Sequence, residues 1–436
     1  MTEHHGGRAA ALSTLAKANP AAYGRTRNHV DGAVTHLSPY LRHGVITLDE
    51  VRRHILATDA PHAYRLINQL SWRDFFTRVY AEIGWEIWSD LEPYKTGWPA
   101  THYLPQMPAD ITEARTGLAC IDAWSTELHD TGWLHNHIRL WLASYVVHHR
   151  GVRWQAGARW FLTHLLDGDL AANNLSWQWV SSTWRRYPYL WNRANLVRNA
   201  GRRWCDTCPL QTSGCPFATT YPNLTHRLFP NGTQPAEAPQ FDPARLKAVT
   251  TPTPATPPPT NPTRALVWIH GERLSPTNEA LLAYPTSPAV FVWDDPLLTR
   301  KKYNPLRLRL MQQSLAETPA TVGRGDVVAE LRHAAAEHGA TTIVTTPAPG
   351  PRHATFVDAL TRAGLTLHTW HPTPFTDTPP TLNLWRHTPY WHAIKTAALT
   401  PNSTPEVPPG PWRDCPPNGV SGLTLRQLSA GKVGHR

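Results

Sequence analysis

Side chains suited to chemistry are concentrated between Leu166 and Trp179, a stretch that holds two acids, two asparagines and two tryptophans. They are Asp167, Asp169, Asn173, Asn174, Trp177 and Trp179. Buried carboxylates are costly unless they are paired or hydrogen-bonded, so core packing alone does not explain this pattern. Tryptophans suit electron transfer and base stacking as well as core packing. A surface turn followed by an amphipathic segment is the alternative that the spacing leaves open.

Five cysteines form a second pattern of chemical interest. Cys205, Cys208 and Cys215 follow a Cys-x2-Cys-x6-Cys spacing, and Cys120 lies upstream of them. In a cytoplasmic chain this spacing indicates metal binding rather than disulfides. Four thiolates suit either zinc or a 4Fe–4S cluster, and unliganded thiols are the third alternative. Cys415 stands outside the pattern and is expected to be free.

Length and composition set the class of protein. A chain of 436 residues predicts two or three domains, and a hydrophobic fraction of 41% predicts a globular fold rather than disorder. No window reaches the ~18 apolar residues that a membrane-spanning helix needs. The N-terminus has no apolar signal core. We therefore expect a cytoplasmic protein with no membrane contact.

The charge balance points weakly to an anionic partner. The net charge is +10 and the isoelectric point is about 9.5, which favours nucleic acid among possible partners. The 24 histidines are scattered, as in His4-His5 and His148-His149, with no His-Glu-x-x-His helix. Solvated histidines are therefore expected in preference to a histidine-based metal site.

The elements that must position these residues differ between the two halves of the chain. Hydrophobic periodicity predicts an all-α domain over residues 1–230, with a polar, turn-rich segment at Tyr23–Val34. The expected helices are Ala9–Ala18, Val51–Ala57, Ala63–Trp88, Gly117–Leu128, Asn136–His148 and Trp154–Leu166. A Pro/Thr-rich run predicts an extended linker over residues 231–264.

Strands and helices alternate after the linker, which predicts a parallel α/β sheet over residues 265–400. The expected strands are Ala265–Ile269, Ala289–Trp293, Thr342–Val344 and Leu365–Leu367, with helices at Asp326–His338 and Ala354–Ala363. The Pro-rich residues 401–436 are expected to form an irregular tail.

Two segments carry a resemblance to a known family. Gly132–Arg139 and Asp167–Trp179 resemble the paired motifs in the flavin-binding domain of the photolyase/cryptochrome family, and the likeness covers roughly Tyr23 to Phe217. The resemblance implies an all-α FAD-binding domain. Residues 265–400 resemble the family's Rossmann-like antenna domain, which normally precedes the flavin domain. We therefore expect a circularly permuted order, with an antenna chromophore possible but unassigned.

The resemblance also implies the flavin contacts. The implied cofactor-binding residues are Tyr23, Arg27, Thr35, Leu37, Ser38, Trp72, Asn136, Arg139, Asp167, Asp169 and Asn173. Thr35 to Ser38 would hold the diphosphate at a helix start, where hydroxyls and N–H groups favour anions; an ordinary helix cap is the alternative. Asn173 would face flavin N5. Asp167 is expected to pair with Arg139, and a purely structural ion pair is the alternative.

The resemblance assigns further roles to the aromatic residues. Trp177 would be the electron donor nearest the flavin and Trp154 the second, with Trp98 or Tyr103 as the third. The residues implied in catalysis are Trp72, Gln69, Trp179 and Asn173, of which Trp72, Gln69 and Trp179 would contact a flipped lesion. Most relatives that repair cyclobutane dimers carry glutamate at the place of Gln69, and Leu140 replaces their frequent methionine.

Bacterial iron–sulfur photolyases and cryptochromes share the Cys-Asp-Thr-Cys and Cys-Pro-Phe motifs, although the last loop is shorter here. That likeness implies a 4Fe–4S cluster on Cys120, Cys205, Cys208 and Cys215. The expected activity is blue-light-driven repair of pyrimidine photoproducts in DNA by electron transfer from reduced FAD. A cryptochrome-like photoreceptor and a redox flavoprotein without repair are the alternatives. The sequence leaves open cyclobutane versus (6-4) lesions and the oligomeric state.

Overall fold

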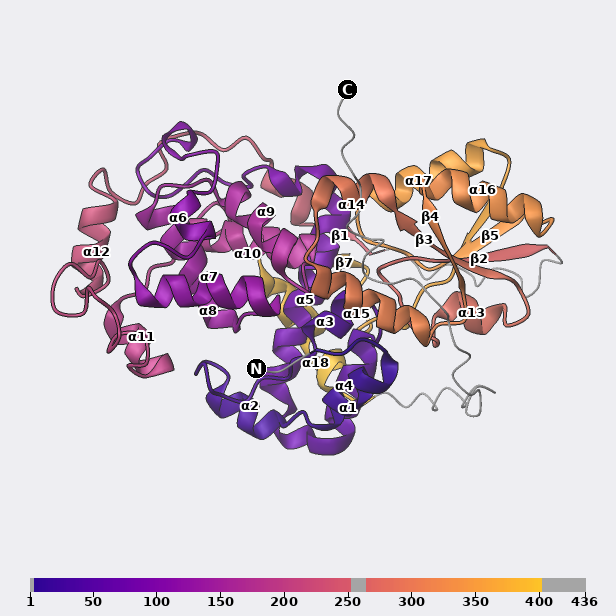
Figure 1. Ribbon diagram of the computed structural model, residues 1–436, viewed down its shortest axis with the longest axis horizontal. Coiled ribbons are helices and arrows are strands. Elements are labelled where there is room, and N and C mark those ends of the chain that lie inside the picture. The colour runs from indigo at the N-terminus through magenta and orange to yellow at the C-terminus, as the bar shows by residue number, and fades with distance from the viewer. Residues whose placement is uncertain (1–3, 252–263, 402–436) are drawn as a thin grey trace, which may run out of the picture. The chain divides into compact units, whose positions relative to one another are not determined.

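The computed structural model describes residues 4–251 and 264–401 and combines a helical first part with an α/β second part (Figure 1). Cys415, residues 252–263 of the expected linker and residues 402–436 of the expected tail lie outside the described residues. Within the described residues, no helix has both the length and the apolar character needed to cross a bilayer.

Helices make up the first part, as the periodicity predicts. They are α1 (Arg8–Ala16), α2 (Pro20–Thr26), α3 (Ser38–Arg42), α4 (Leu48–Asp59), α5 (Ala63–Ile83), α6 (Ala109–Thr112), α7 (Ala119–Thr131), α8 (Asn136–Ser144), α9 (Trp154–His164), α10 (Leu170–Ser181), α11 (Arg193–Ala200) and α12 (Tyr221–Leu228). Helix α2 corrects the expectation of a turn-rich segment from Tyr23. Asn19 caps this helix and Pro20 occupies its first turn, two start signals that the sequence carries.

The second part contains the expected parallel sheet, in the order β4-β3-β2-β5-β6. Its strands are β2 (Ala265–Ile269), β3 (Ala289–Asp294), β4 (Thr321–Gly325), β5 (Thr342–Thr345) and β6 (Thr366–Thr369). Helices α13 (Glu279–Ala283), α14 (Asp295–Lys301), α15 (Pro305–Ala316), α16 (Val327–Glu337) and α17 (Pro351–Arg362) connect them. Strand β4 was not expected, because its small and exposed residues lack a strand pattern.

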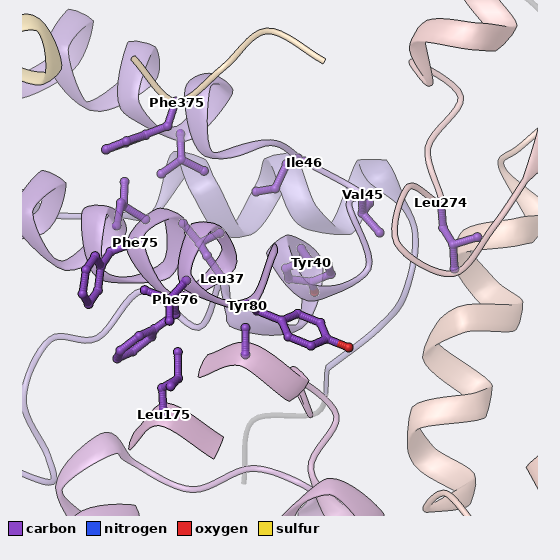
Figure 2. Close-up of a cluster of buried hydrophobic side chains, with 14 of the residues drawn as sticks. Leu37, Tyr40, Val45, Ile46, Phe75, Phe76, Tyr80, Leu175, Leu274 and Phe375 are labelled. Carbon is purple, nitrogen blue, oxygen red and sulfur yellow. The ribbon is translucent and has the colours of Figure 1, made fainter. Parts of the chain in front are cut away.

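One hydrophobic core joins the two parts. In Figure 2, Val45 from the loop before α4 lies beside Leu274 from the loop after β2. The backbone N–H of Leu274 donates to the carbonyl of His43 at 2.8 Å. Arg42 pairs with Glu272 at 2.5 Å next to this contact. The α/β part therefore supports the segment that leads from α3 to α4.

The last described helix, α18 (His387–Leu399), returns to the helical part. Tyr390 and Ile394 are buried in the same core as Phe75 of α5, and the Tyr390 hydroxyl donates to the Asp74 carboxylate. A short antiparallel pair, β1 (Val249–Thr250) with β7 (Thr381–Leu382), ties the chain together before α18. The expected α/β range of 265–400 thus ends in a helix that packs on α5.

Candidate functional site

The loop between α9 and α10 carries Asp169, which is buried and has two partners. Its Oδ1 accepts from the Ala172 N–H at 2.8 Å and so caps α10, and its Oδ2 accepts from Arg73 Nη2 at 2.7 Å. Burial raises the pKa of the Asp169 carboxyl, but the charges of Arg73 and Arg42 outweigh burial and lower it. Asp169 is therefore held as a carboxylate.

Asp167 lies on the same loop, and the predicted ion pair with Arg139 is present. Arg139 Nη2 donates to Asp167 Oδ2 at 3.0 Å, which connects the loop to α8. Burial raises the pKa of Asp167, whereas the Arg139 charge and hydrogen bonds from Arg139 and Ser38 lower it, and the net direction is down. Ser38 begins α3, so the hydroxyl expected to touch phosphate lies beside this ion pair.

Asn173 stands one turn into α10. Its Nδ2 donates to the Ala158 carbonyl at 3.0 Å and to Asn174 Oδ1 at 3.1 Å. Asn174 in turn donates to the Ile87 carbonyl at 3.3 Å. These bonds fix the amide and use its N–H groups, so the Asn173 oxygen is the atom left to meet a ligand.

The end of α2 and the start of α8 form another wall. Arg27 lies close enough to Tyr23 for its charge to act on the phenol, and His135 Nδ1 accepts from the His137 N–H at 3.1 Å. Asn136 opens α8 and is exposed, with His135 as the N-cap. Burial is the main cause that lowers the pKa of His135 to about 4, so its ring is neutral near pH 7.

His36 marks a strained point in the segment expected to hold phosphate. Its φ of 53° lies in the left-handed region, which costs a non-glycine residue ~1–3 kcal/mol. Its ring lies 4.6 Å from Trp133 and 5.6 Å from His4, measured between ring centroids. Leu37 is buried and precedes α3, whose N-terminus has no side-chain cap. Thr35 precedes His36 and is half-buried.

Sequence reasoning missed His4, His36 and Trp133 as neighbours of the site. The expectation of solvated histidines is wrong at His4, where burial and the charge of His36 lower the pKa to about 4, and at His148, which is buried. The sequence signal for His36 was its place directly after Thr35, a candidate phosphate contact.

Several buried polar atoms here lack partners in the described part of the chain. They are His4 Nε2, His36 Nδ1 and Asp167 Oδ1, and the charges of Asp167 and Arg139 both act on His4. Buried polar groups normally have hydrogen-bond partners. A flavin nucleotide carries ring heteroatoms, hydroxyls and phosphates that would supply them, so these residues fit FAD.

Trp72 and Gln69 lie on α5. The Trp72 ring stacks on His387 of α18 with centroids 3.8 Å apart and planes 11° apart, so one of its faces is covered. Gln69 Nε2 approaches Asn68 Oδ1 at 3.5 Å. Trp179 belongs to a different hydrophobic cluster from Trp72, and within the described residues their rings make no contact.

Trp179 is half-buried on α10 and has two aromatic or cationic neighbours. The Arg185 guanidinium lies 3.9 Å above the Trp179 ring, and the Tyr189 ring lies 5.4 Å away. Leu140 packs against the same cluster. Within the described residues Arg185 has no acidic partner, so a cation stands free beside the indole expected to meet a base.

Trp177 of α10 and Trp154 of α9 are both buried. Trp177 lies against Phe161, with centroids 5.0 Å apart, and against Gly157, where a Cβ would overlap the indole. Trp154 begins α9, and Trp88 lies parallel to it with centroids 6.4 Å apart.

The structure places neither expected third donor beside Trp154. Trp98 stacks on His102 at 4.1 Å, and Tyr103 stacks on Tyr94 at 4.2 Å. Trp88 is the tryptophan found there. The sequence signal for Trp88 was its place at the end of the predicted helix Ala63–Trp88.

The four cysteines line one pocket. Cys120 comes from α7, and Cys205, Cys208 and Cys215 come from the turns after α11. Burial is the main cause that raises the pKa of the Cys120 thiol, and the other three thiols raise it further. The rest of the lining is four apolar residues and two polar ones, namely Leu118, Leu196, Trp204, Phe217, Arg193 and Gln211. Among the described residues, no three histidine, cysteine or acidic side chains are grouped closely enough to hold a single metal ion.

Comparison with known proteins matches residues 66–202 to the family model described as the FAD binding domain of DNA photolyase. A deoxyribodipyrimidine photo-lyase of Streptomyces griseus is 35% identical over 151 residues, which are 35% of this chain and 32% of that protein. The Escherichia coli protein of the same name is 35% identical over 124 residues, which are 27% of this chain and 25% of that protein. The chain thus spans a quarter to a third of these relatives' lengths.

Two solved structures match about half of the chain with TM-scores below 0.5. A bacterial class III photolyase from Agrobacterium tumefaciens matches with a TM-score of 0.41 and 18% identity, over 52% of this chain and 55% of that one. A Synechocystis cryptochrome matches with a TM-score of 0.40 and 21% identity, over 53% of each chain.

Proposed function

We propose, from the match of residues 66–202 to the FAD binding domain of DNA photolyase, that the helical part of this chain belongs to the photolyase/cryptochrome family and that the protein is an FAD-dependent, blue-light-driven photolyase. Its substrate would be a pyrimidine photoproduct in DNA, and its reaction a carbon–carbon lyase reaction of the deoxyribodipyrimidine photolyase type. The observation that carries the proposal is the pair of buried ion pairs, Asp167–Arg139 and Asp169–Arg73, beside partnerless polar atoms that fit a flavin.

Bound FAD would supply light absorption and a single electron, which would pass to the lesion, drive cleavage of the bonds that join its two pyrimidines, and then return to the flavin. The protein's own residues would hold and orient the cofactor. Arg139 and Arg73 place fixed positive charge beside the cofactor, and their carboxylate partners keep that charge in position. Ser38, Thr35 and Arg27 would hold the phosphates. The bonds of its own N–H groups leave the Asn173 oxygen free, and this oxygen would meet the flavin ring.

Trp72, Gln69 and Trp179 would meet the flipped lesion. A flipped base needs aromatic or apolar walls and a few hydrogen bonds, which an indole and an amide supply. Arg185 and the exposed Arg186 lack acidic partners within the described residues, so both are available to phosphate oxygens. A net charge of +10 favours the same partner.

The cysteine pocket is proposed to hold a 4Fe–4S cluster on Cys120, Cys205, Cys208 and Cys215. Convergence of all four thiols on one pocket supports this. The sheet that follows the helical part is proposed to be a permuted antenna domain, whose chromophore stays unassigned.

A cryptochrome-like photoreceptor, or a redox flavoprotein without repair, is the second candidate. Two observations favour it: Gln69 stands where most relatives that repair cyclobutane dimers carry glutamate, and His387 covers one face of Trp72. Both alternatives keep the flavin and the tryptophans and lose only the lesion contacts.

A repair assay separates these functions. Purified full-length protein with fully reduced FAD is mixed with an oligonucleotide that carries one cyclobutane dimer or one (6-4) photoproduct, and lesion loss is followed under blue light and in the dark. We expect light-dependent loss of one of the two lesions. A Trp179→Ala variant that retains FAD should lose most of this repair activity. No repair of either lesion by flavin-loaded protein would contradict the photolyase proposal.

A further inference from the structure

Trp154 has an unusual hydrogen-bond partner for a fully buried indole. Its Nε1–H donates to Asp90 Oδ1 at 2.5 Å, in the segment that follows α5. Gln155 Nε2 donates to the same oxygen at 3.1 Å and to the Trp88 carbonyl at 3.3 Å, which fixes the carboxylate against the ring. By contrast, within the described residues the Trp177 Nε1–H has no acceptor.

The charges around Trp88 are of the opposite sign. The Arg159 guanidinium lies 4.9 Å from the centroid of the Trp88 ring, and the Lys301 ammonium lies 5.7 Å from it. Fixed cations at these distances oppose a further positive charge on the indole, whereas an adjacent carboxylate favours one. An electron vacancy that reaches Trp154 is therefore stabilised there and disfavoured on the parallel Trp88 ring.

We propose that Trp154 is the last donor of the electron relay and that Asp90 takes its indole proton. The proposal rests on the flavin site of the proposed function. The excited flavin gains one electron from Trp177, and Trp154 returns one electron to Trp177. The Trp154 N–H bond then breaks and an Asp90 O–H bond forms. The products are a flavin with one more electron, a neutral Trp154 radical and a neutral Asp90, so electrons and protons balance.

The surroundings of Asp90 suit a proton acceptor. An indole N–H becomes strongly acidic once the ring loses an electron, and the 2.5 Å contact already aligns it with a carboxylate oxygen. Burial raises the pKa of Asp90 and makes it a stronger base, and Glu237 acts in the same direction. Hydrogen bonds from Trp154 and Gln155 and the charge of Arg153 act against it, and Tyr94 lies close by.

Flash spectroscopy on the full-length, FAD-loaded protein tests the proposal. The radical formed after a blue pulse is identified by its absorption and by electron paramagnetic resonance. We expect a neutral tryptophan radical in the unaltered protein. In Asp90→Asn, which keeps the hydrogen-bonded shape and removes the base, we expect a cationic radical that recombines at least tenfold faster. Trp88→Phe should leave the radical's yield and lifetime unchanged.

An unchanged neutral radical in Asp90→Asn would overturn the proton-acceptor role, and loss of the long-lived radical in Trp88→Phe would show that the relay continues outward. Flavin content and circular dichroism of each variant establish that it is folded. Should Asp90→Asn fail to fold, deuterium oxide replaces it as the probe: slower formation of the neutral radical is expected, and an unchanged rate contradicts the proposal. If the protein forms the expected radicals but repairs no lesion, the proposed photolyase activity is contradicted and the proton-acceptor role of Asp90 is not.

Discussion

Arg73 Nη2 and Asp169 Oδ2 lie 2.7 Å apart although 96 positions separate them in the chain. The contact locks α5 to the loop that begins α10, and Asp169 also caps α10 through its other oxygen. One carboxylate therefore sets the position of a helix start and of a cation next to the proposed flavin.

Replacing Arg73 with leucine should leave the buried Asp169 charge without its main partner. Breaking a buried pair from one side costs about 3–5 kcal/mol, so we expect lower unfolding free energy and loss of bound FAD. Chemical denaturation and flavin absorption measure both. Arg53→Leu is the matched control, because Arg53 pairs with Asp49 but is itself 39% exposed, and we expect a change below about 1 kcal/mol. Equal losses in the two variants would contradict the prediction.

Stability should fall toward acid because of Asp167 and Asp169. Their pKa values are lower in the folded protein than in the unfolded chain, owing to Arg139 and Arg73. Their contribution is therefore complete above the unfolded pKa of ~4 and is lost as pH falls through the folded pKa values. Denaturation measured from pH 7 downward checks this. Asp167→Asn should show a shallower acid loss, and an unchanged pH profile in that variant would exclude Asp167 as a source.

Gly157→Ala should displace Trp177, because a Cβ at this position would overlap the indole. Overpacking of this kind costs about 1–3 kcal/mol, and a shifted Trp177 should also slow flavin photoreduction. Melting curves and photoreduction rates measure the two effects. Gly24→Ala in α2 is the control, since its Cβ would make only ordinary contacts with Arg65 and alanine favours a helix. An unaffected photoreduction rate in Gly157→Ala would show that flavin photoreduction does not depend on the position of Trp177.

Cys205→Ser should remove bound iron and the broad absorption that accompanies the flavin bands, because a thiolate ligand of the proposed cluster is lost. Iron analysis and absorption spectra of the purified variant measure this. Cys415→Ser, outside the Cys-x2-Cys-x6-Cys spacing, should keep both signals. If the Cys205 variant keeps its iron, the cluster assignment is wrong.

The sequence predicted those parts of the fold whose signal is local. The helical period of Trp154–Leu166 predicted α9, and the apolar run Ala265–Ile269 predicted the buried strand β2. Likewise, the Asp167–Arg139 pair followed from matched motifs.

Long-range contacts had no such signal. The sequence around His387 does not predict that its ring stacks on Trp72, 315 positions earlier. That contact forms only when α18 packs on α5. The Asp90–Trp154 bond and the stacking of Trp88 on Trp154 were hidden in the same way, because each joins residues more than 60 positions apart.

Helix α18 has a consequence for the order in which the protein is made. Tyr390 and Ile394 complete the apolar layer around Phe75, yet the ribosome adds them more than 300 residues after α5. A nascent chain therefore exposes an unfinished apolar groove along α5 until almost the whole described sequence has been translated. Chaperones that bind apolar surface would have their longest access at that groove.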